Sequence, residues 1–139
     1  MNARSFLDTN IFVYCFDTSA PRKGRRAEEL IYEALATKHG VISYQVMLEF
    51  TAVVRRFRIP MRFEDIEDYC QTALLPLLTV YFTPELYWRA LNLARRDQLS
   101  WYDALIVAAS LQSGCKVLYS EDLQHGRRFG DLVVENPFL

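Results

Sequence analysis

Short apolar runs that alternate with segments of helical periodicity constrain the fold of this chain more than any other feature. Most of these runs are continuously apolar rather than alternating with polar residues, as in strands that are covered on both faces. Strands alternating with helices predict an α/β fold, with a central, mostly parallel sheet of about five short strands flanked by helices on both faces. The predicted strands are SFL (5–7), VIS (41–43), LLTVYF (77–82), KVLYS (116–120) and LVV (132–134).

The segments between these strands carry apolar residues at intervals of three and four, the spacing of amphipathic helices. Two helices also have recognisable ends. Thr83 and Pro84 form a cap followed by proline at the first helical position, and Gly114 follows the last predicted helix. The predicted helices cover residues 27–35, 46–57, 63–74, 83–96 and 100–113, and a short one is expected to begin near Thr9.

A chain of 139 residues suits one domain, which is expected to span residues 1–139. A domain of this size buries roughly 68% of its unfolded surface, which is enough for a self-sufficient core. With 51% hydrophobic and 24% charged residues, the composition is that of a globular protein rather than a disordered one. The sequence contains no evident linker and no repeat at a solenoid period.

The hydropathy pattern argues against membrane and secreted proteins. The longest charge-free run, 69–84, is shorter than the ~18 apolar residues of a membrane span and is divided by Pro76. The first residues, MNARSFLD, lack the apolar stretch of a signal peptide, so a cytoplasmic location is expected. The three cysteines, 15, 70 and 115, are odd in number and widely spaced, which favours free thiols over disulfides. Because only two histidines could join these cysteines as ligands, a zinc site is not expected.

Four acidic residues follow the predicted strands or begin the helices that leave them. Asp8 comes directly after the first strand, and Asp122 follows the KVLYS strand by one residue. Glu49 lies on the helix after VIS, within about two turns of its start, and Asp103 lies in the first turn of the helix opened by Ser100. Ligand sites of parallel sheets lie outside the carboxyl ends of the strands, so we expect all four to face one cleft.

Each acid taken alone also has a structural explanation. Asp103 occupies the third helical position after Ser100, as in a capping box. Asp8 could form a turn ahead of the helix near Thr9, and Asp122 could do the same in SEDLQHG. Glu49 could be an ordinary surface residue.

Taken together, the four carboxylates would repel each other and need compensation. Arg4 is the one arginine close to any of them in sequence, and no lysine is near. Two Mg²⁺ or Mn²⁺ ions would neutralise the four charges, since such hard cations prefer oxygen ligands and keep several waters. Polar residues next to the acids could support the ligands: Thr9, Asn10, Ser43 and Ser120.

The net charge of −1 does not by itself indicate a nucleic-acid-binding protein. Positive charge is nevertheless clustered in 22–26, 55–58, 95–96 and 125–128, and neutralising the four acids would leave a modestly basic remainder. These clusters are candidate phosphate contacts, with Tyr44, Trp101 and Tyr102 available for base stacking. They could equally be solvated faces and core aromatics.

Four motifs in order, FLDTNIFVY, ISYQVMLEF, WYDALIVAAS and VLYSEDLQHG, resemble the PIN-domain ribonucleases, specifically the VapC toxins of VapBC toxin–antitoxin pairs. The resemblance covers nearly the whole chain. It implies that Asp8, Glu49, Asp103 and Asp122 bind one or two Mg²⁺ or Mn²⁺ ions and cleave single-stranded or structured RNA, tRNA included. Asn10 matches the polar residue usual after the first acid, and Ser120 stands where threonine is commoner. Spacing from the strand favours Asp122 over the adjacent Glu121, which remains an alternative.

The resemblance also implies a homodimer and a small antitoxin that covers the site, often with a basic side chain among the carboxylates. The expected reaction is in-line hydrolysis of a phosphodiester to 5′-phosphate and 3′-hydroxyl ends, with Glu49 as ligand or water-orienting base. The main alternative is a non-catalytic RNA- or partner-binding protein on the same scaffold. A receiver-like domain would need an acidic pair at the first strand and a later lysine, and a dehalogenase-type phosphatase would need Asp-x-Asp where Asp8-Thr9-Asn10 stands.

Overall fold

A computed structural model describes residues 3–139 and contains one six-stranded sheet in the order β3-β2-β1-β4-β6-β5. Every strand pair is parallel except β5 and β6, which are antiparallel. The predicted α/β fold with a mostly parallel sheet is therefore confirmed. The strands are β1 (Arg4–Leu7), β2 (Gly40–Ser43), β3 (Leu78–Val80), β4 (Cys115–Tyr119), β5 (Arg128–Phe129) and β6 (Leu132–Glu135).

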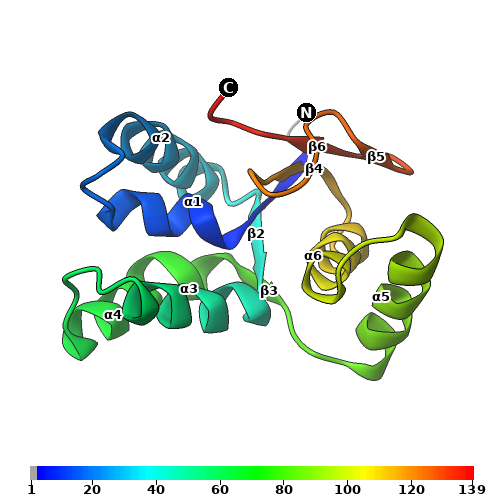
Figure 1. The fold of residues 1–139 in the computed structure, drawn as a ribbon, viewed down its shortest axis with the longest axis horizontal. Coiled ribbons are helices and arrows are strands. Elements are labelled where there is room, and N and C mark those ends of the chain that lie inside the picture. Colours follow the sequence, from blue (N-terminus) through cyan, green and yellow to red (C-terminus); the bar gives the residue numbers. More distant parts are fainter. Residues whose placement is uncertain (1–2) are drawn as a thin grey trace.

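Helices cover both faces of the sheet, with α1 to α4 on one side and α5 and α6 on the other (Figure 1). A 3₁₀ turn, Tyr14–Phe16, continues α1, and a π-helical segment, Cys70–Leu74, continues α4. The helices are α1 (Thr9–Val13), α2 (Pro21–Thr37), α3 (Tyr44–Arg56), α4 (Phe63–Tyr69), α5 (Pro84–Asp97) and α6 (Trp101–Gln112).

Three elements differ from the sequence-based expectation. The run 77–82 forms a strand only over Leu78–Val80, because Leu75–Leu77 is a 3₁₀ turn and Tyr81 and Phe82 are exposed beyond the sheet. The two-residue β5 was not predicted, since it is too short to show a pattern and pairs only through its hairpin with β6. Helix α2 begins six residues earlier than its apolar periodicity, at Pro21, because its first turns are basic and exposed.

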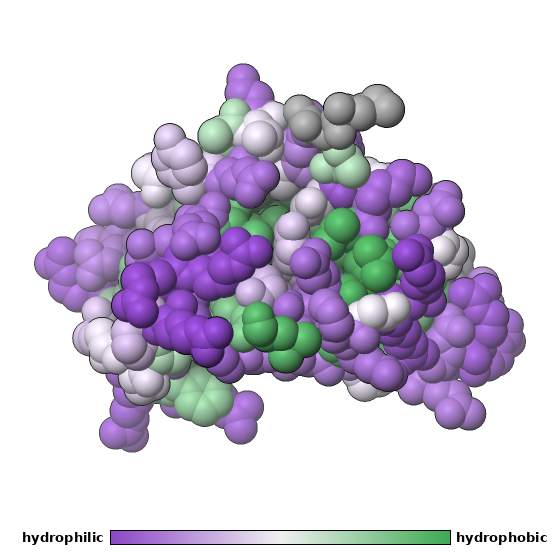
Figure 2. All heavy atoms as spheres, turned by 90° about the horizontal axis from the view of Figure 1, so that it is seen from above, coloured by the Kyte–Doolittle hydropathy of each residue, from purple (hydrophilic) through white to green (hydrophobic). Residues whose placement is uncertain are grey.

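The core lies where the sheet meets its helices. Phe6, Ile42 and Leu118, from three neighbouring strands, are fully buried, as expected for strands covered by helices on both faces. Most of α6 is also buried, from Ala104 to Ser110. Seen from above, the surface is mainly hydrophilic with small hydrophobic areas (Figure 2). Within residues 3–139, none of the helices combines the length and apolar character needed to cross a bilayer.

Two glycines allow α2 to pack closely against its neighbours. A Cβ at Gly24 would lie 2.9 Å from the backbone oxygen of Tyr14, and a Cβ at Gly40 would lie 2.3 Å from the Cβ of Ala34. Both distances are too short for two heavy atoms, so a side chain at either position would separate α2 from α1 or from β2. The packing of α2 therefore depends on the absence of these Cβ atoms.

Replacing Gly40 by alanine should destabilise the protein by about 2–3 kcal/mol, because overpacking at this contact would displace the backbone of α2. Urea denaturation followed by circular dichroism measures the change. The double variant Gly40→Ala/Ala34→Gly should recover part of the lost free energy, since it removes the shortest contact. Equal stability of Gly40→Ala and wild type would contradict this role of the glycine.

Candidate active site

Parallel pairing of β1 with β4 brings the first and last predicted acids to the same edge of the sheet. Leu7 pairs with Tyr119, and the amide of Asp8 donates a hydrogen bond to the Tyr119 carbonyl over 3.0 Å. Asp8 and Ser120, which directly follow β1 and β4, therefore lie side by side. The Ser120 hydroxyl donates to Asp8 Oδ2 over 2.8 Å, although the two residues are 112 positions apart.

Asp8 is buried and is also the N-cap of α1. Its Oδ1 accepts from the Thr9 amide at 2.8 Å, so the local turn that the sequence suggested is present together with the contact to Ser120. Burial raises the pKa of Asp8 to about 7, and the charges of Asp122 and Glu49 add to the effect, against the hydrogen bonds from Thr9 and Ser120. A cation at this position would favour the charged carboxylate.

Glu49 is held by hydrogen bonds to both of its oxygens. The Thr9 hydroxyl donates to Oε1 over 2.7 Å, and the Gln45 amide donates to Oε2 over 3.2 Å. The same Gln45 nitrogen lies 3.2 Å from the carbonyl oxygen of Tyr102, so it connects α3 to the first turn of α6. Sequence reasoning missed Gln45, although its position one turn before Glu49 on the same helix face was a usable signal.

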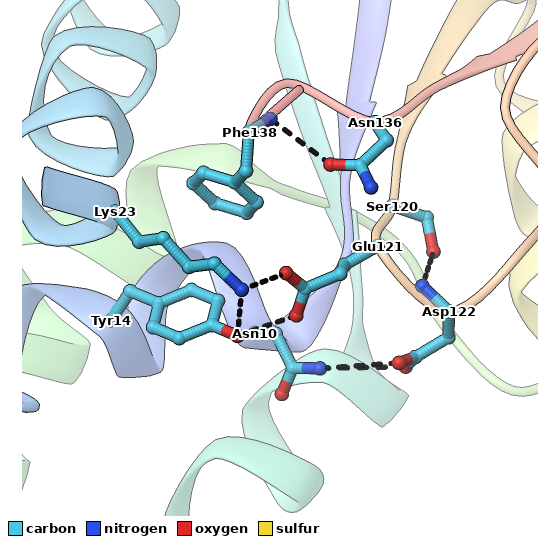
Figure 3. Close-up of polar contacts among 8 residues, drawn as sticks. All are labelled: Asn10, Tyr14, Lys23, Ser120, Glu121, Asp122, Asn136 and Phe138. Atoms are coloured by element: carbon cyan, nitrogen blue, oxygen red, sulfur yellow. Dashed lines mark hydrogen bonds and ion pairs between the residues drawn. The ribbon is translucent and has the colours of Figure 1, made fainter. Parts of the chain in front are cut away.

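Asp122 follows β4 and faces α1. Asn10 Nδ2 lies 3.4 and 3.5 Å from its two carboxylate oxygens, and the Asp122 amide donates to Ser120 Oγ over 3.2 Å (Figure 3). Partial burial raises the pKa of Asp122, and the charges of Asp103, Glu121 and Glu49 raise it further. Asp122 is therefore within electrostatic reach of two other predicted acids, one on α6 and one on α3.

Asp103 enters the site from the first turn of α6. Its amide donates to the Ser100 hydroxyl over 3.4 Å, which is half of the suspected capping box. Within residues 3–139, the return hydrogen bond from the Ser100 amide to the Asp103 carboxylate does not occur, and this carboxylate accepts no other hydrogen bond. The cap thus leaves the charge of Asp103 available to the site.

Glu121, the alternative to Asp122, is directed to different partners. It accepts hydrogen bonds from Tyr14 and Lys23, and Figure 3 shows its carboxylate facing both of these side chains. The pKa of Glu121 is lowered, because the contacts with Lys23 and Tyr14 outweigh its partial burial. Glu121 already has a cation, and its geometry favours Asp122 as the fourth member of the site.

None of the four predicted acids forms an ion pair with another residue of the described chain, 3–139. Arg4, the closest arginine in sequence, instead contacts the Ser113 carbonyl. Thr9, Asn10 and Ser120 each donate to one of the acids, whereas the buried Ser43 hydroxyl has no hydrogen-bond partner within residues 3–139. The predicted support from Ser43 is thus not seen.

The oxygen-rich composition of the site suits a hard divalent cation. Within residues 3–139, no three carboxylate, imidazole or thiolate side chains lie close enough together to ligate one ion directly. Mg²⁺ does not require such a cage, because it is usually bound through one or two carboxylates and keeps several waters. Asp8 and Asp122, with raised pKa values and no cation, fit this mode of binding.

The family of the chain follows from its sequence as well as its fold. The sequence model of the PIN domain family matches residues 5–128, which include all four acids. The chain therefore belongs to the PIN domain family, and membership supports a nuclease role. A search of curated proteins gave no significant match.

Several solved structures that share the fold are toxins or toxin–antitoxin complexes. VapC20 of Mycobacterium tuberculosis, described as a toxin that cleaves the sarcin–ricin loop, has 21% identity and a TM-score of 0.62, over 85% of this chain and 89% of its own. A toxin–antitoxin complex from Klebsiella pneumoniae has 17% identity and a TM-score of 0.66, over 96% and 97%. VapBC2 of Rickettsia felis, bound to a fragment of promoter DNA, has 19% identity and a TM-score of 0.60, over 94% and 96%.

Replacing Asp8 by asparagine should raise the melting temperature in EDTA by a few degrees, at roughly 2–4 °C per kcal/mol for a domain of this size. Asparagine retains the N-cap and removes a buried charge that has no cation. Adding Mg²⁺ should then stabilise the wild type more than the variant. A lower melting temperature in EDTA, with an unchanged response to Mg²⁺, would argue against a cation at Asp8.

Proposed function

We propose that the protein is a metal-dependent endoribonuclease and the toxin of a toxin–antitoxin pair. One observation carries the proposal: in a PIN domain, the charges of Asp8, Glu49 and Asp103 act on Asp122 or on one another, and none of these four acids has an ion pair within residues 3–139. A structural role would favour ion pairs for buried carboxylates, because an unpaired buried charge is costly. A site that must accept a cation and a phosphate has a reason to keep them unpaired.

In this proposal Asp8, Glu49, Asp103 and Asp122 hold one or two Mg²⁺ or Mn²⁺ ions. When bound, such an ion neutralises phosphate oxygens and lowers the pKa of a water. Thr9, Asn10 and Ser120 orient the carboxylates through the hydrogen bonds described above. Glu49 also carries the role of water-orienting base in this proposal, since Thr9 and Gln45 fix both of its oxygens.

The products distinguish hydrolysis from transesterification. Attack by water in line with the leaving oxygen yields a 5′-phosphate and a 3′-hydroxyl. Attack by the ribose 2′-hydroxyl would yield a 2′,3′-cyclic phosphate and would refute this mechanism. For the substrate we propose structured RNA, tRNA included, a class supported by the description of the Mycobacterium tuberculosis relative as a sarcin–ricin loop cleaving toxin.

The antitoxin is proposed from the assemblies in which this fold is found. The structures from Klebsiella pneumoniae and Rickettsia felis are toxin–antitoxin complexes. A basic side chain from such a partner would find four carboxylates that lack a cation. An inhibitor that supplies this charge would neutralise the site and exclude a metal at the same time. We propose a cytoplasmic location for the complex, where its RNA substrates are found.

We also propose a homodimer, with an aromatic surface on α5 and α6 as its interface. This surface consists of Phe82, Tyr87, Trp88, Trp101 and Tyr102, and it surrounds a hollow of about 600 Å³. All but Trp101 are about half exposed or more, which is unusual for clustered aromatics in a monomer and typical of interfaces. Tyr102 precedes Asp103, so a second copy at this surface would bring two active sites close together.

The alternative function is a non-catalytic RNA- or partner-binding protein on a PIN scaffold. Such a protein would need neither the cation nor all four acids. Asp103→Asn separates the two possibilities, because it removes one charge from a carboxylate that has no hydrogen bond within residues 3–139. Asparagine at this position leaves the cap of α6, the Ser100 hydroxyl, intact.

Asp103→Asn should lower RNA cleavage by at least about 100-fold, the scale lost when a metal-assisted or electrostatic group is removed, and should leave the fold unchanged. The assay uses purified, antitoxin-free protein, total cellular RNA and Mg²⁺ or Mn²⁺, with sequencing of the product ends. Asp68→Asn serves as the matched acid-to-amide control, because Asp68 is exposed on α4, away from the site. Metal-independent products, or wild-type cleavage by Asp103→Asn, would contradict the assignment.

Trp88→Ala should raise the dimer dissociation constant at least about tenfold, corresponding to the loss of 1.4 kcal/mol or more at an aromatic interface residue. Sedimentation equilibrium over a range of concentrations measures this constant. Tyr32→Ala is the matched control, since Tyr32 is an aromatic residue 77% exposed on α2, outside the aromatic surface. A monomeric wild type, or equal dissociation constants for all three proteins, would refute this interface.

A further inference from the structure

Lys23 is held beside the proposed active site by residues from two other elements. Its Nζ donates to one oxygen of Glu121 and, over 3.3 Å, to the Tyr14 hydroxyl, which donates in turn to the other oxygen of Glu121 (Figure 3). An ammonium group has three N–H donors, so one donor of Lys23 has no partner within residues 3–139. The side chain is 39% exposed. Lys23 is thus positioned and still accessible.

Aromatic rings fix the position of the ammonium group further. Nζ lies 5.0 Å from the centroid of the Tyr14 ring and 5.7 Å from that of Phe138, distances at which a cation is attracted to a ring face. The next residue, Gly24, lets α2 approach the Tyr14 backbone, which a Cβ would prevent. The packing of α2 therefore helps to bring Lys23 to Tyr14 and Glu121.

A basic groove begins at Lys23 and runs between the first turns of α2 and the C-terminal segment. It has a volume of about 440 Å³, within the usual range for small-ligand sites, and is lined by Arg22, Lys23, Arg26, Pro137 and Phe138 among others. None of the described residues, 3–139, contributes an acidic side chain to its lining. Arg22 is exposed and forms no ion pair within residues 3–139, whereas Arg26 donates to the Pro137 carbonyl and pairs with Glu29.

The groove adjoins the carboxylates through two neighbouring contacts. Asn10 and Tyr14, one helical turn apart, contact Asp122 and Glu121, which are consecutive in sequence. Lys23 contacts both Tyr14 and Glu121. A polyanion that approaches four uncompensated acids is repelled, and cations at the rim reduce that repulsion and increase the rate of encounter.

We propose, on the basis of the proposed ribonuclease function, that the basic groove binds a phosphate group of the RNA next to the cleavage site. In this proposal Lys23 binds that phosphate through its remaining donor, and Glu121 and Tyr14 hold the lysine side chain in place. Arg22 provides a second contact to the RNA backbone. RNA is the occupant favoured over an acidic protein, because the scissile phosphate must lie at the acids that the groove adjoins.

The test is RNA binding in EDTA, measured by the fluorescence anisotropy of a labelled single-stranded RNA at several salt concentrations. Arg22→Ala and Lys23→Ala should each weaken binding several-fold and reduce the magnitude of the salt slope by about 0.7, the value for one phosphate contact on a single strand. Lys23→Arg should retain most of the affinity, which a purely structural role of the lysine would not predict. Arg89→Ala, which removes an exposed cation of α5 that lies outside the four basic clusters, is the control and should leave the slope unchanged.

Unchanged affinity and slope in Arg22→Ala and Lys23→Ala would overturn the proposal and assign the groove to a protein partner. An equal loss in Arg89→Ala would also overturn it, because the effect would then be one of net charge. Because binding in EDTA does not require cleavage, the ribonuclease proposal and the groove proposal can be refuted independently of each other. A wild type that binds through the groove without cleaving RNA refutes only the nuclease, and cleavage with unchanged slopes refutes only the groove.

Discussion

The parallel pairing of β1 with β4 is the contact on which the site depends. It joins residues more than a hundred positions apart and places Asp8 next to Ser120 at one edge of the sheet. Phe6 and Leu7 of β1 and Leu118 of β4 are apolar and buried, so a shift of register would cost core packing as well as the hydrogen bond between Asp8 and Ser120. The core of the sheet thereby sets the position of a buried carboxylate.

The site shows a conflict between stability and the proposed activity. Asp8 is buried among like charges, and its raised pKa reflects the cost of keeping it ionised. Hydrogen bonds from Thr9 and Ser120 reduce that cost, but within residues 3–139 no lysine or arginine removes it. Lys23 is close enough to pair with Glu121, yet it neutralises this neighbouring acid and not Asp122. The arrangement leaves the four acids for an external cation.

Two surfaces border these acids and differ in chemistry. The basic groove contacts the loop after β4 through Lys23, and the aromatic surface begins at Tyr102, next to Asp103. A phosphate backbone suits the first, because its recognition is electrostatic. A second protein copy suits the second, because burial of aromatic area dominates such contacts. The proposed substrate and the proposed dimer partner would thus approach the acids from different elements.

The α/β fold, five of the strands and five of the helices were predictable from periodicity, because that pattern is local. The acids could also be singled out, since each follows a strand or opens a helix. Their hydrogen-bond partners were less accessible: Thr9, Asn10 and Ser120 stand beside an acid in sequence, whereas Gln45, Tyr14 and Lys23 acquire their roles through contacts between separate elements. Spacing from the strand already favoured Asp122 over Glu121, and the tertiary structure adds that Glu121 is directed to Tyr14 and Lys23. Sequence accounts for the types of residues present, and long-range packing decides which of them meet.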